Sequence, residues 1–554
     1  MAADSIDPVQ LEIIRNALVA AAEEMSVTVW RTSRSTVVRE MLDYSTQIFD
    51  GRGRAVAQAA RIPVHLNSMS VCLDRIVADF IPLEDWHEGD VILTNDPYCG
   101  GQHLPDFVAF KPVFVDGVRV GIAATIVHHI DVGGGAAGSY YPQAREVYHE
   151  GLRIPPCKVV EAGKLNKAVV AIIRQNSREP EQIGGDFSSQ LAAMEIGGQA
   201  LRKLAARYGS DALQAAMDAL LDQSDRTMRA MLSDLPDGTY RFTDYVDDDG
   251  ITDARLKLEC AVTIAGDEAV VDFTGSSPQA VGPVNCTLNM TASGIYCAFA
   301  MLADGKVMAN SGAYRAISIK AEEGTVVSAR APAPVANRMA TGHRVVTTVL
   351  GALAQAAPDR VPAAYYGVSY VQTLATPDPE TGAPRVYFEI EIGGWGAHPA
   401  QDGADAFSAG FHNSSSTPVE LNEAYFPLTF MEYSLIPGSG GDGKHRGGTG
   451  LRRAYRVDAA SGGQLSGNFE RFKVPPYGLS GGEPGRTGRF YLVRDGEARA
   501  LPSKLANQQV ERGDIVVLET AGGGGFGSPA ERGDAARARD IAGGYVIDPS
   551  AEAR

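Results

Sequence analysis

The chain contains 554 residues, of which 44% are hydrophobic and 21% are charged. These proportions are typical of a globular protein, and the length predicts about two to four domains. The net charge of −17 argues against a nucleic-acid partner, because phosphate backbones are bound by clustered cations. The six cysteines form no C-x-x-C pair, which argues against a zinc ribbon or a disulfide scaffold.

The sequence also bears on the compartment. The N-terminal residues carry acids early and lack the basic and apolar pattern of a secretory signal. The chain has no uninterrupted apolar run of about 18 residues, the length that spans a bilayer. We therefore predict a reduced, cytoplasmic protein with no membrane partner.

The N-terminal part of the chain shows the patterns of helices and hairpins. Asp7 and Pro8 favour a helix start, because Asp caps free N–H groups and Pro fits the first turn. Each predicted hairpin turns at an Asp-Gly pair between β-forming residues. The predicted elements are a helix to about residue 27, hairpins at 43–59 and 106–127, and amphipathic helices at 189–208 and 211–234.

The rest of the chain is richer in short strands. We predict strands through 238–330, a helix at 343–357, a glycine-rich β region at 365–530 and a last helix after it. The predicted fold class is α+β, with a mixed N-terminal α/β lobe and a β-rich C-terminal lobe. The predicted domains are 1–235, which carries the site, 236–360, which is β-rich with a helix, and 361–554.

Two motifs concentrate ionisable residues. The stretch NDPYCGGQHLPDFVAF contains Asp96, His103 and Asp106, and the stretch VHHIDVGGG contains His128 and His129. The proline before Asp106 disfavours a helix and forces an extended segment. Both motifs therefore lie at the open end of the second predicted hairpin.

The pairing of this hairpin decides which histidine meets Asp106. A two-residue turn places Asp106 opposite Val127. Neighbouring residues of a strand point to opposite faces, so this simple register favours His129. A one-residue bulge at Pro112 would favour His128 instead.

Two imidazoles and a carboxylate on one face suit a divalent metal such as Mn²⁺, Zn²⁺ or Fe²⁺. Three protein ligands leave positions open for water and substrate. The alternative is that these side chains only cap turns and bond to backbone amides.

A second sequence feature is the glycine-rich stretch AGGGGFG at 521–527, which follows a predicted strand. It could cradle an anion with its N–H groups. We favour a tight turn in which backbone packs on backbone, because no basic residue or helix follows. The chain has no G-x-x-x-x-G-K-[ST] motif, and hence no P-loop.

Several motifs, in order along nearly the whole chain, resemble those of the hydantoinase B / 5-oxoprolinase family. They are DPVQLEIIRNALVAAAEEM, LDYSTQIFDGRGRAVAQ, IPVHLNSM, GDVILTNDPYCGGQHLPDF, VHHIDVGG, EIGGWGAHPAQDG, NSSSTPVE, GSGGDGKHRGGTG and TAGGGGFGSPAER. The resemblance implies a subunit of an ATP-dependent hydrolase that opens hydantoins, 5-oxoproline or lactams. It also implies a hydantoinase A-type partner of actin/hexokinase-like fold that binds the ATP.

The resemblance further implies roles for individual residues. The H-x-x-D pair and the later histidine that hold a metal in related carboxylase subunits correspond to His103, Asp106 and His128. This implies the bulged register, with His129 as the second choice. Asp43 stands where the family also has an acid, and we expect it as a fourth ligand.

The remaining expectations concern the reaction. We expect the partner's ATP to phosphorylate the cyclic amide and metal-bound water to attack it. His129 or Asp96, whichever lies near that water, is the expected general base. The expected assembly is an (AB)2 heterotetramer. The alternatives are a subunit of an ATP-dependent acetone or acetophenone carboxylase and a non-enzymatic scaffold for the ATPase partner.

Overall fold

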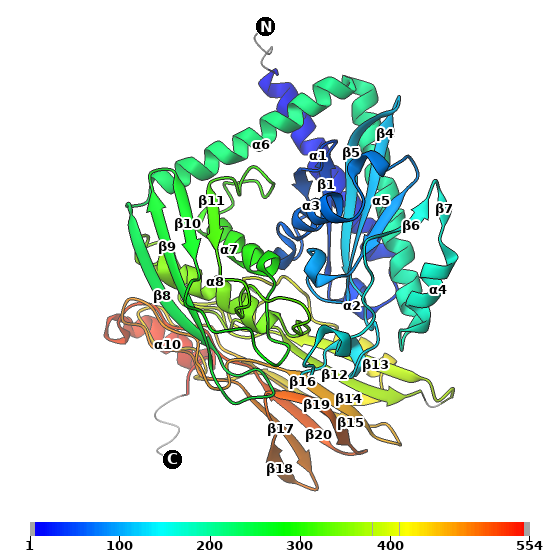
Figure 1. Cartoon of the computed structure of the whole chain (residues 1–554). Helices are drawn as coiled ribbons and strands as arrows, with labels where there is room; N and C mark the ends of the chain where they lie inside the picture. Colours follow the sequence, from blue (N-terminus) through cyan, green and yellow to red (C-terminus); the bar gives the residue numbers. More distant parts are fainter. Residues whose placement is uncertain (1–5, 379, 409, 548–554) are drawn as a thin grey trace.

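An antiparallel sheet of seven strands forms the N-terminal part of the molecule (Figure 1). The computed structural model describes residues 6–378, 380–408 and 410–547. In the sheet, the strands follow the order β2-β1-β5-β4-β3-β6-β7. Their bounds are β1 (Tyr44–Asp50), β2 (Ala55–Gln58), β3 (Val91–Thr94), β4 (Asp106–Val115), β5 (Val118–His128), β6 (Cys157–Glu161) and β7 (Lys164–Leu165).

Helices cover both faces of this sheet. Alternation along β4 and β5 sends one set of apolar side chains, including Phe107 and Val127, toward α1 (Pro8–Thr32) and α5 (Pro180–Tyr208). The other set, which includes Phe110, packs against α3 (Ser68–Asp79). The two faces of β4 and β5 therefore see different surroundings.

A sheet of four strands, in the order β11-β10-β9-β8, forms the middle of the chain. Its strands are β8 (Gly238–Val246), β9 (Leu256–Ala265), β10 (Glu268–Asp272) and β11 (Ile317–Lys320). Helix α6 (Ser210–Ser233) runs from the first sheet to this one (Figure 1). Beside the sheet lie α7 (Leu288–Leu302) and α8 (Met339–Leu353), and every residue of α8 is buried.

The C-terminal part contains two further antiparallel sheets. One consists of β12 (Tyr370–Pro377), β13 (Pro384–Glu391), β16 (Gly463–Asn468) and β19 (Lys504–Val510). The other consists of β14 (Leu428–Leu435), β15 (Leu451–Val457), β17 (Arg489–Arg494), β18 (Glu497–Ala500) and β20 (Ile515–Glu519). The remaining helices are α2 (Thr36–Arg39), α4 (Lys167–Gln175), α9 (Val419–Tyr425) and α10 (Asp534–Ala542). Short 3-10 helices span Pro63–His65, Leu83–Asp85, Pro97–Cys99, Ala137–Ser139, Val147–His149 and Pro529–Glu531.

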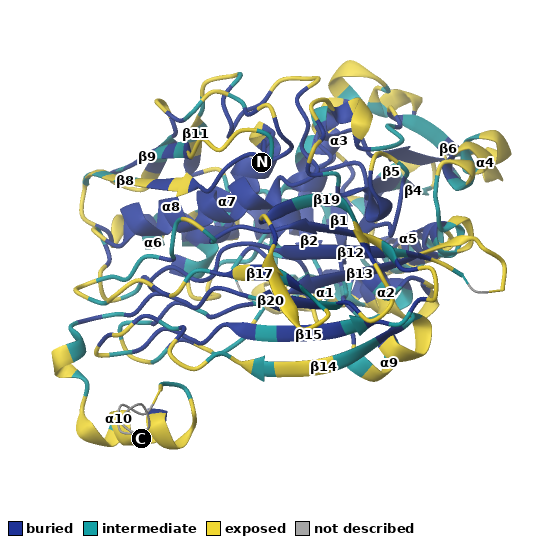
Figure 2. Ribbon diagram, turned by 90° about the horizontal axis from the view of Figure 1, so that it is seen from below, coloured by how far each residue is buried: buried dark blue, intermediate teal, exposed yellow. Residues whose placement is uncertain are grey.

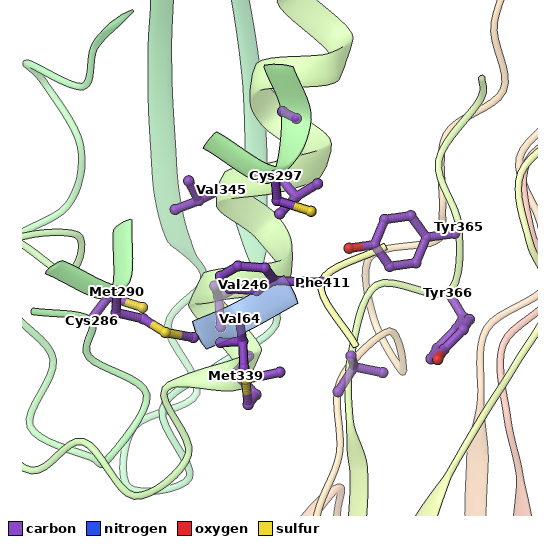
Figure 3. Close-up of a cluster of buried hydrophobic side chains, with 14 of the residues drawn as sticks. Val64, Val246, Cys286, Met290, Cys297, Met339, Val345, Tyr365, Tyr366 and Phe411 are labelled. Atoms are coloured by element: carbon purple, nitrogen blue, oxygen red, sulfur yellow. The ribbon is translucent and has the colours of Figure 1, made fainter. Parts of the chain in front are cut away.

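One hydrophobic cluster joins the middle and C-terminal parts. It contains Met290 and Val345 from α7 and α8, Tyr365 and Phe411 from the C-terminal part, and Val64 from the N-terminal part (Figure 3). Buried segments lie in all three parts of the chain (Figure 2). The predicted boundaries near 235 and 360 stay predictions, and this core crosses both.

The α+β class and most predicted elements are confirmed, and α3, α4 and α9 are helices that the sequence analysis did not predict. Helix α5 begins at Pro180, earlier than predicted. Its first turns were not predicted because Gly184 and Gly185 weaken the helical sequence pattern there. Helix α7 lies inside the region predicted as strands. It was not predicted because a buried, apolar segment lacks the periodicity that marks an amphipathic helix. In the ranges that the structure describes, no helix is long and apolar enough to cross a membrane.

The glycine-rich stretch at 521–527 packs backbone against backbone, as predicted. The Gly441 N–H donates to the Gly523 carbonyl at 2.8 Å, and the Gly523 N–H donates to the Gly448 carbonyl at 2.9 Å. A Cβ atom at Gly523 would lie 2.0 Å from the carbonyl oxygen of Trp395. The backbones of these loops therefore pack directly on one another, and the space between them is too small for a side chain.

A buried ion network links the middle part to the C-terminal sheets. The Lys504 Nζ lies 2.6 Å from Glu470 Oε1 and 3.4 Å from Asp248 Oδ1. The Arg344 Nη2 of α8 lies 3.2 Å from the other oxygen of Glu470. Removal of one partner from such a network leaves an unpaired buried charge, which costs more than the intact pair contributes.

We therefore predict that Lys504→Met destabilises the chain by about 3–5 kcal/mol, measured by chemical denaturation. The matched control is Arg315→Ala, which breaks the partly exposed Arg315–Asp222 pair and should cost about 0.5 kcal/mol or less. Equal losses in the two variants would contradict the prediction.

Candidate functional site

A bulge near the turn of the β4–β5 hairpin sets which residues meet at its open end. Val113 pairs with Gly121 and Phe114 with Arg119, so Val120 is an extra residue in β5. Asp106 therefore lies opposite His128. The simple register, which placed Val127 there, is wrong because of this inserted residue.

The bulge lies next to Pro112 rather than at it. Pro112 itself pairs with Ile122 within the regular ladder. On its other side, β3 pairs with β4 only from Val108 to Phe110. Pro112 therefore lies past the end of β3, where its missing N–H interrupts no pairing with that strand.

His103, Asp106 and His128 form a buried cluster with Tyr140. The His103 Nδ1 lies 2.6 Å from Asp106 Oδ2, and the His103 Nε2 lies 3.1 Å from the Tyr140 hydroxyl. The ring centroids of His103 and His128 are 5.0 Å apart. A tight turn, closed by the Asp106 N–H donating to the His103 carbonyl, brings the first two side chains together.

Arg338 completes the cluster from a distant part of the chain. Its Nη2 donates to Asp106 Oδ2 at 2.9 Å, and its Nη1 lies 3.5 Å from the Tyr140 hydroxyl. Both Arg338 and Tyr140 are buried. Neither was predicted, because a lone Arg or Tyr far from the histidine motifs carries no signal in a single sequence.

Asp43 lies beside these residues at the start of β1. The His128 N–H donates to the Asp43 carbonyl at 3.1 Å. Burial, followed by the nearby charge of Asp106, raises the pKa of the Asp43 carboxyl to about 7. The structure thus brings together all four residues expected as ligands.

The two imidazoles of the cluster are held neutral. Burial lowers the pKa of His103 and of His128 well below the usual range, and nearby cationic groups add to the effect. Neutral imidazole is the form that binds a metal.

The two residues expected as the base lie elsewhere. His129 faces α5, where its Nε2 lies 3.2 Å from Gln190 Oε1. Its ring centroid lies 4.2 Å from that of Phe107 in β4. Asp96 caps the short helix Pro97–Cys99 through the Tyr98 N–H and pairs with Arg153 at 2.9 Å. The structure brings neither to the face on which His103 and His128 meet.

The unpartnered atoms of the cluster test whether a metal fits. Asp106 Oδ1 and both ring nitrogens of His128 are buried and have no hydrogen-bond partner. This carboxylate oxygen and these ring nitrogens, with the neutral imidazole of His103, are the kinds of ligand atom that bind divalent metals. Across residues 6–378, 380–408 and 410–547, however, no three His, Cys, Asp or Glu side chains are arranged around one metal position. The donor chemistry fits, and the metal itself stays a prediction.

Two further histidines line the same interior. The His65 Nδ1 lies 2.9 Å from the Ser45 hydroxyl, and the His412 Nε2 lies 3.2 Å from that of Ser414. The charge of Arg338 acts on both rings. His65 was present in the motif IPVHLNSM, which could have pointed to it, whereas His412 stands in no such histidine motif.

The fold and the site together define the class of protein. The chain belongs to the hydantoinase B/oxoprolinase family, whose sequence profile matches residues 7–529. The caprolactamase subunit beta of Pseudomonas jessenii is 34% identical over 556 residues, which cover 98% of this chain and 94% of that protein. An uncharacterised protein of Methanocaldococcus jannaschii is 36% identical over 530 residues, covering 95% of this chain and 92% of that protein. The match to 5-oxoprolinase 1 of Arabidopsis thaliana, at 31% identity over 555 residues, covers 95% of this chain but 42% of that longer protein.

Two solved structures share the fold. The crystal structure of the ATP-dependent caprolactamase from Pseudomonas jessenii superposes with a TM-score of 0.91 at 32% identity, covering 99% of this chain and 98% of that one. The nucleotide-free structure of acetone carboxylase gives a TM-score of 0.92 at 20% identity, covering 99% of this chain and 79% of that one. The second likeness shows the fold alone.

We predict that His128→Ala and His129→Ala have different effects. His128→Ala should lower zinc or manganese affinity by at least about tenfold, because it removes a donor from the cluster. His129→Ala should leave that affinity unchanged and lower stability instead, since it removes the packing on Phe107 and the bond to Gln190. Metal titration and thermal unfolding measure the two effects, and an exchange of the two results would contradict the assignment of faces.

The buried histidines also predict a pH dependence of stability. Burial lowers the pKa of His65, His129 and His412 to about 4 each, below the value of about 6.5 in an unfolded chain. Between these values the unfolded state binds more protons, so stability is full above about pH 6.5 and falls toward pH 4. Asp43, with its raised pKa, opposes this loss below about pH 7. Asp43→Asn should therefore steepen the fall of the melting temperature with acidification, and a shallower fall would contradict the argument.

Proposed function

We propose that this chain is the B-type subunit of an ATP-dependent hydrolase of cyclic amides, working with an A-type subunit that binds ATP. The observation that carries the proposal is the buried group of Asp43, His103, Asp106 and His128 in a chain of similar length and the same fold as a caprolactamase subunit. That relative is named as a subunit beta, which supports a partner subunit here. The (AB)2 stoichiometry belongs to the same proposal.

The chemistry explains why ATP is needed. A cyclic amide is a poor electrophile, and transfer of the γ-phosphoryl group to its oxygen turns that oxygen into part of a phosphate ester. Water then adds to the ring carbon, and the C–N bond breaks as the nitrogen takes up a proton. A second water releases phosphate from the resulting acyl phosphate. The sum is one amino acid, one ADP and one phosphate from one cyclic amide, one ATP and two waters.

Within this chain, the cluster would hold a divalent metal through His103, Asp106 and His128. Such a metal supplies Lewis-acid activation of water. Arg338 and His103 fix Asp106 Oδ2, which leaves Oδ1 free. The low exposure of all these side chains excludes bulk water and strengthens every charge interaction among them.

We assign proton transfer to Asp43 rather than to His129 or Asp96. Its carboxyl lies by the cluster, and its pKa of about 7 suits a group that gains and loses a proton near neutral pH. His129 and Asp96 face other partners, as described above. Asp43 as a fourth metal ligand stays a prediction.

The alternative function is a subunit of an ATP-dependent ketone carboxylase. Its basis is the fold that the chain shares with acetone carboxylase at a TM-score of 0.92. We favour the hydrolase, because the caprolactamase chain matches over 98% of its length at 32% identity, whereas the acetone carboxylase chain is longer and only 20% identical.

The test is turnover by the co-purified complex. The complex with its A-type partner is given ATP and, in turn, hydantoin, 5-oxoproline, caprolactam and acetone with bicarbonate. ATP-dependent opening of a cyclic amide supports the hydrolase, and bicarbonate-dependent loss of the ketone supports the carboxylase. The isolated chain should open no ring, and activity without partner and ATP would refute the two-subunit scheme.

A single substitution tests the role of the cluster. Asp106→Ala should reduce ring opening by more than about 100-fold, beyond the loss that outer-shell partners of a metal usually cause. Asp222→Ala, which removes an exposed carboxylate paired with Arg315, is the control and should keep full activity. Full activity and full metal content in Asp106→Ala would rule the mechanism out.

A further inference from the structure

The loop that leads into α8 contains two buried polar residues, Asn337 and Arg338, and the side chain of Arg338 reaches the cluster. Arg338 is the N-cap residue of α8, and Asn337 precedes it. Arg338 is 3% exposed and Asn337 is 1% exposed, which is rare for residues of these types. The loop is held in place by Glu150, whose Oε1 accepts from the N–H groups of Val335 and Ala336 at 2.7 Å each.

Both side chains have donors that remain unused. The Arg338 Nη2 donates to Asp106 and its Nη1 to Tyr140, but its Nε has no partner. Neither the amide nitrogen nor the amide oxygen of Asn337 has a partner. A buried donor without an acceptor costs about 1–3 kcal/mol, so unused donors on two consecutive buried residues indicate a ligand that accepts hydrogen bonds.

The positive charge at this place comes from Arg338, which also pairs with Asp106. The charge of Arg338 acts on Asp43, His103, His128 and Tyr140, so the guanidinium stands at the centre of the site. The N-terminus of the fifteen-residue helix α8 begins at the next residue and adds its positive end.

We propose that Arg338 and Asn337 bind the phosphoryl group of the activated substrate, and so retain the phosphorylated amide until water opens the ring. This rests on the proposed function and adds the residues that distinguish the activated from the unactivated substrate. Arg338 provides a planar guanidinium, the group best matched to phosphate oxygens, and Asn337 provides a neutral donor. Without them the phosphorylated amide would leave or lose its phosphate to water, which returns the original ring and consumes ATP for nothing.

The test measures the number of ATP molecules hydrolysed per ring opened. In the complex with its A-type partner, Arg338→Gln should raise this ratio by about tenfold or more, as expected for the loss of a charge-assisted hydrogen bond. Arg338→Lys keeps the charge but not the planar fork, and its ratio should lie between those of the wild type and Arg338→Gln.

The matched control is Arg344→Gln on the same helix. Arg344 is also buried, and it bonds to Glu470 and to the carbonyls of Tyr245 and Gly367, away from the histidines. This variant should lower the melting temperature and leave the ratio unchanged. If ATP hydrolysis and ring opening fall together in both Arg338 variants, Arg338 is only structural and the proposal is overturned. If Arg338→Gln does not fold, a wild-type ratio in Arg338→Lys overturns it.

A second measurement needs no turnover. Inorganic phosphate should raise the melting temperature of the wild-type complex and of Arg344→Gln, but not that of Arg338→Gln. The same phosphate shift in the wild type and Arg338→Gln, whatever its size, would overturn the proposal. A wild-type complex that consumes no ATP with any of the test substrates refutes the proposed function itself, and the role of Arg338 with it, whereas normal coupling in Arg338→Gln refutes the role of Arg338 alone.

Discussion

The register of one β-hairpin determines the chemistry of this molecule. Side chains alternate along a strand, so a shift of a single residue moves a whole set from one face of the sheet to the other. Val120, the extra residue of β5, makes that shift and aligns His128 with Asp106. On one face lie His103, His128 and the rest of the cluster, and on the other lie His129 and α5. The identity of the histidine at the site is therefore set near the turn, far along the hairpin from the site itself.

Burial gives this arrangement its second property. The carboxyl groups, imidazoles and guanidinium lie in an interior that solvent does not reach, so each group responds mainly to its neighbours. The same burial that keeps the imidazoles neutral raises the pKa of Asp43 to about 7. Arg338 offsets part of the cost, because its charge sits against Asp106. A closed interior of this kind excludes bulk water, which is what the proposed phosphorylated intermediate would require.

Local sequence signals predicted much of the fold and the histidine and aspartate residues of the cluster. Asp-Gly turns, caps and alternation located both N-terminal hairpins, and the motif with His103 and Asp106 marked the cluster. The bulged register was expected from the resemblance, but the bulge was placed at Pro112, because nothing in VDGVRVG distinguishes Val120 from its neighbours. Arg338 and Tyr140 escaped for a different reason, since their partners are distant in sequence and only the packed tertiary structure joins them. Helix α7 was missed because a buried helix loses the periodicity that marks an amphipathic one.

The contact between Arg338 and Asp106 spans 232 residues of chain, and this separation has a consequence for synthesis. The hairpin with its histidines leaves the ribosome long before the α8 loop exists, so the nascent chain carries Asp106 without its guanidinium partner. Contacts between such distant segments form slowly, because the long intervening loop must close first. The site therefore matures late, when the middle of the chain docks on the first sheet. A truncated chain that ends before the α8 loop would keep its histidine motifs and still lack an assembled centre.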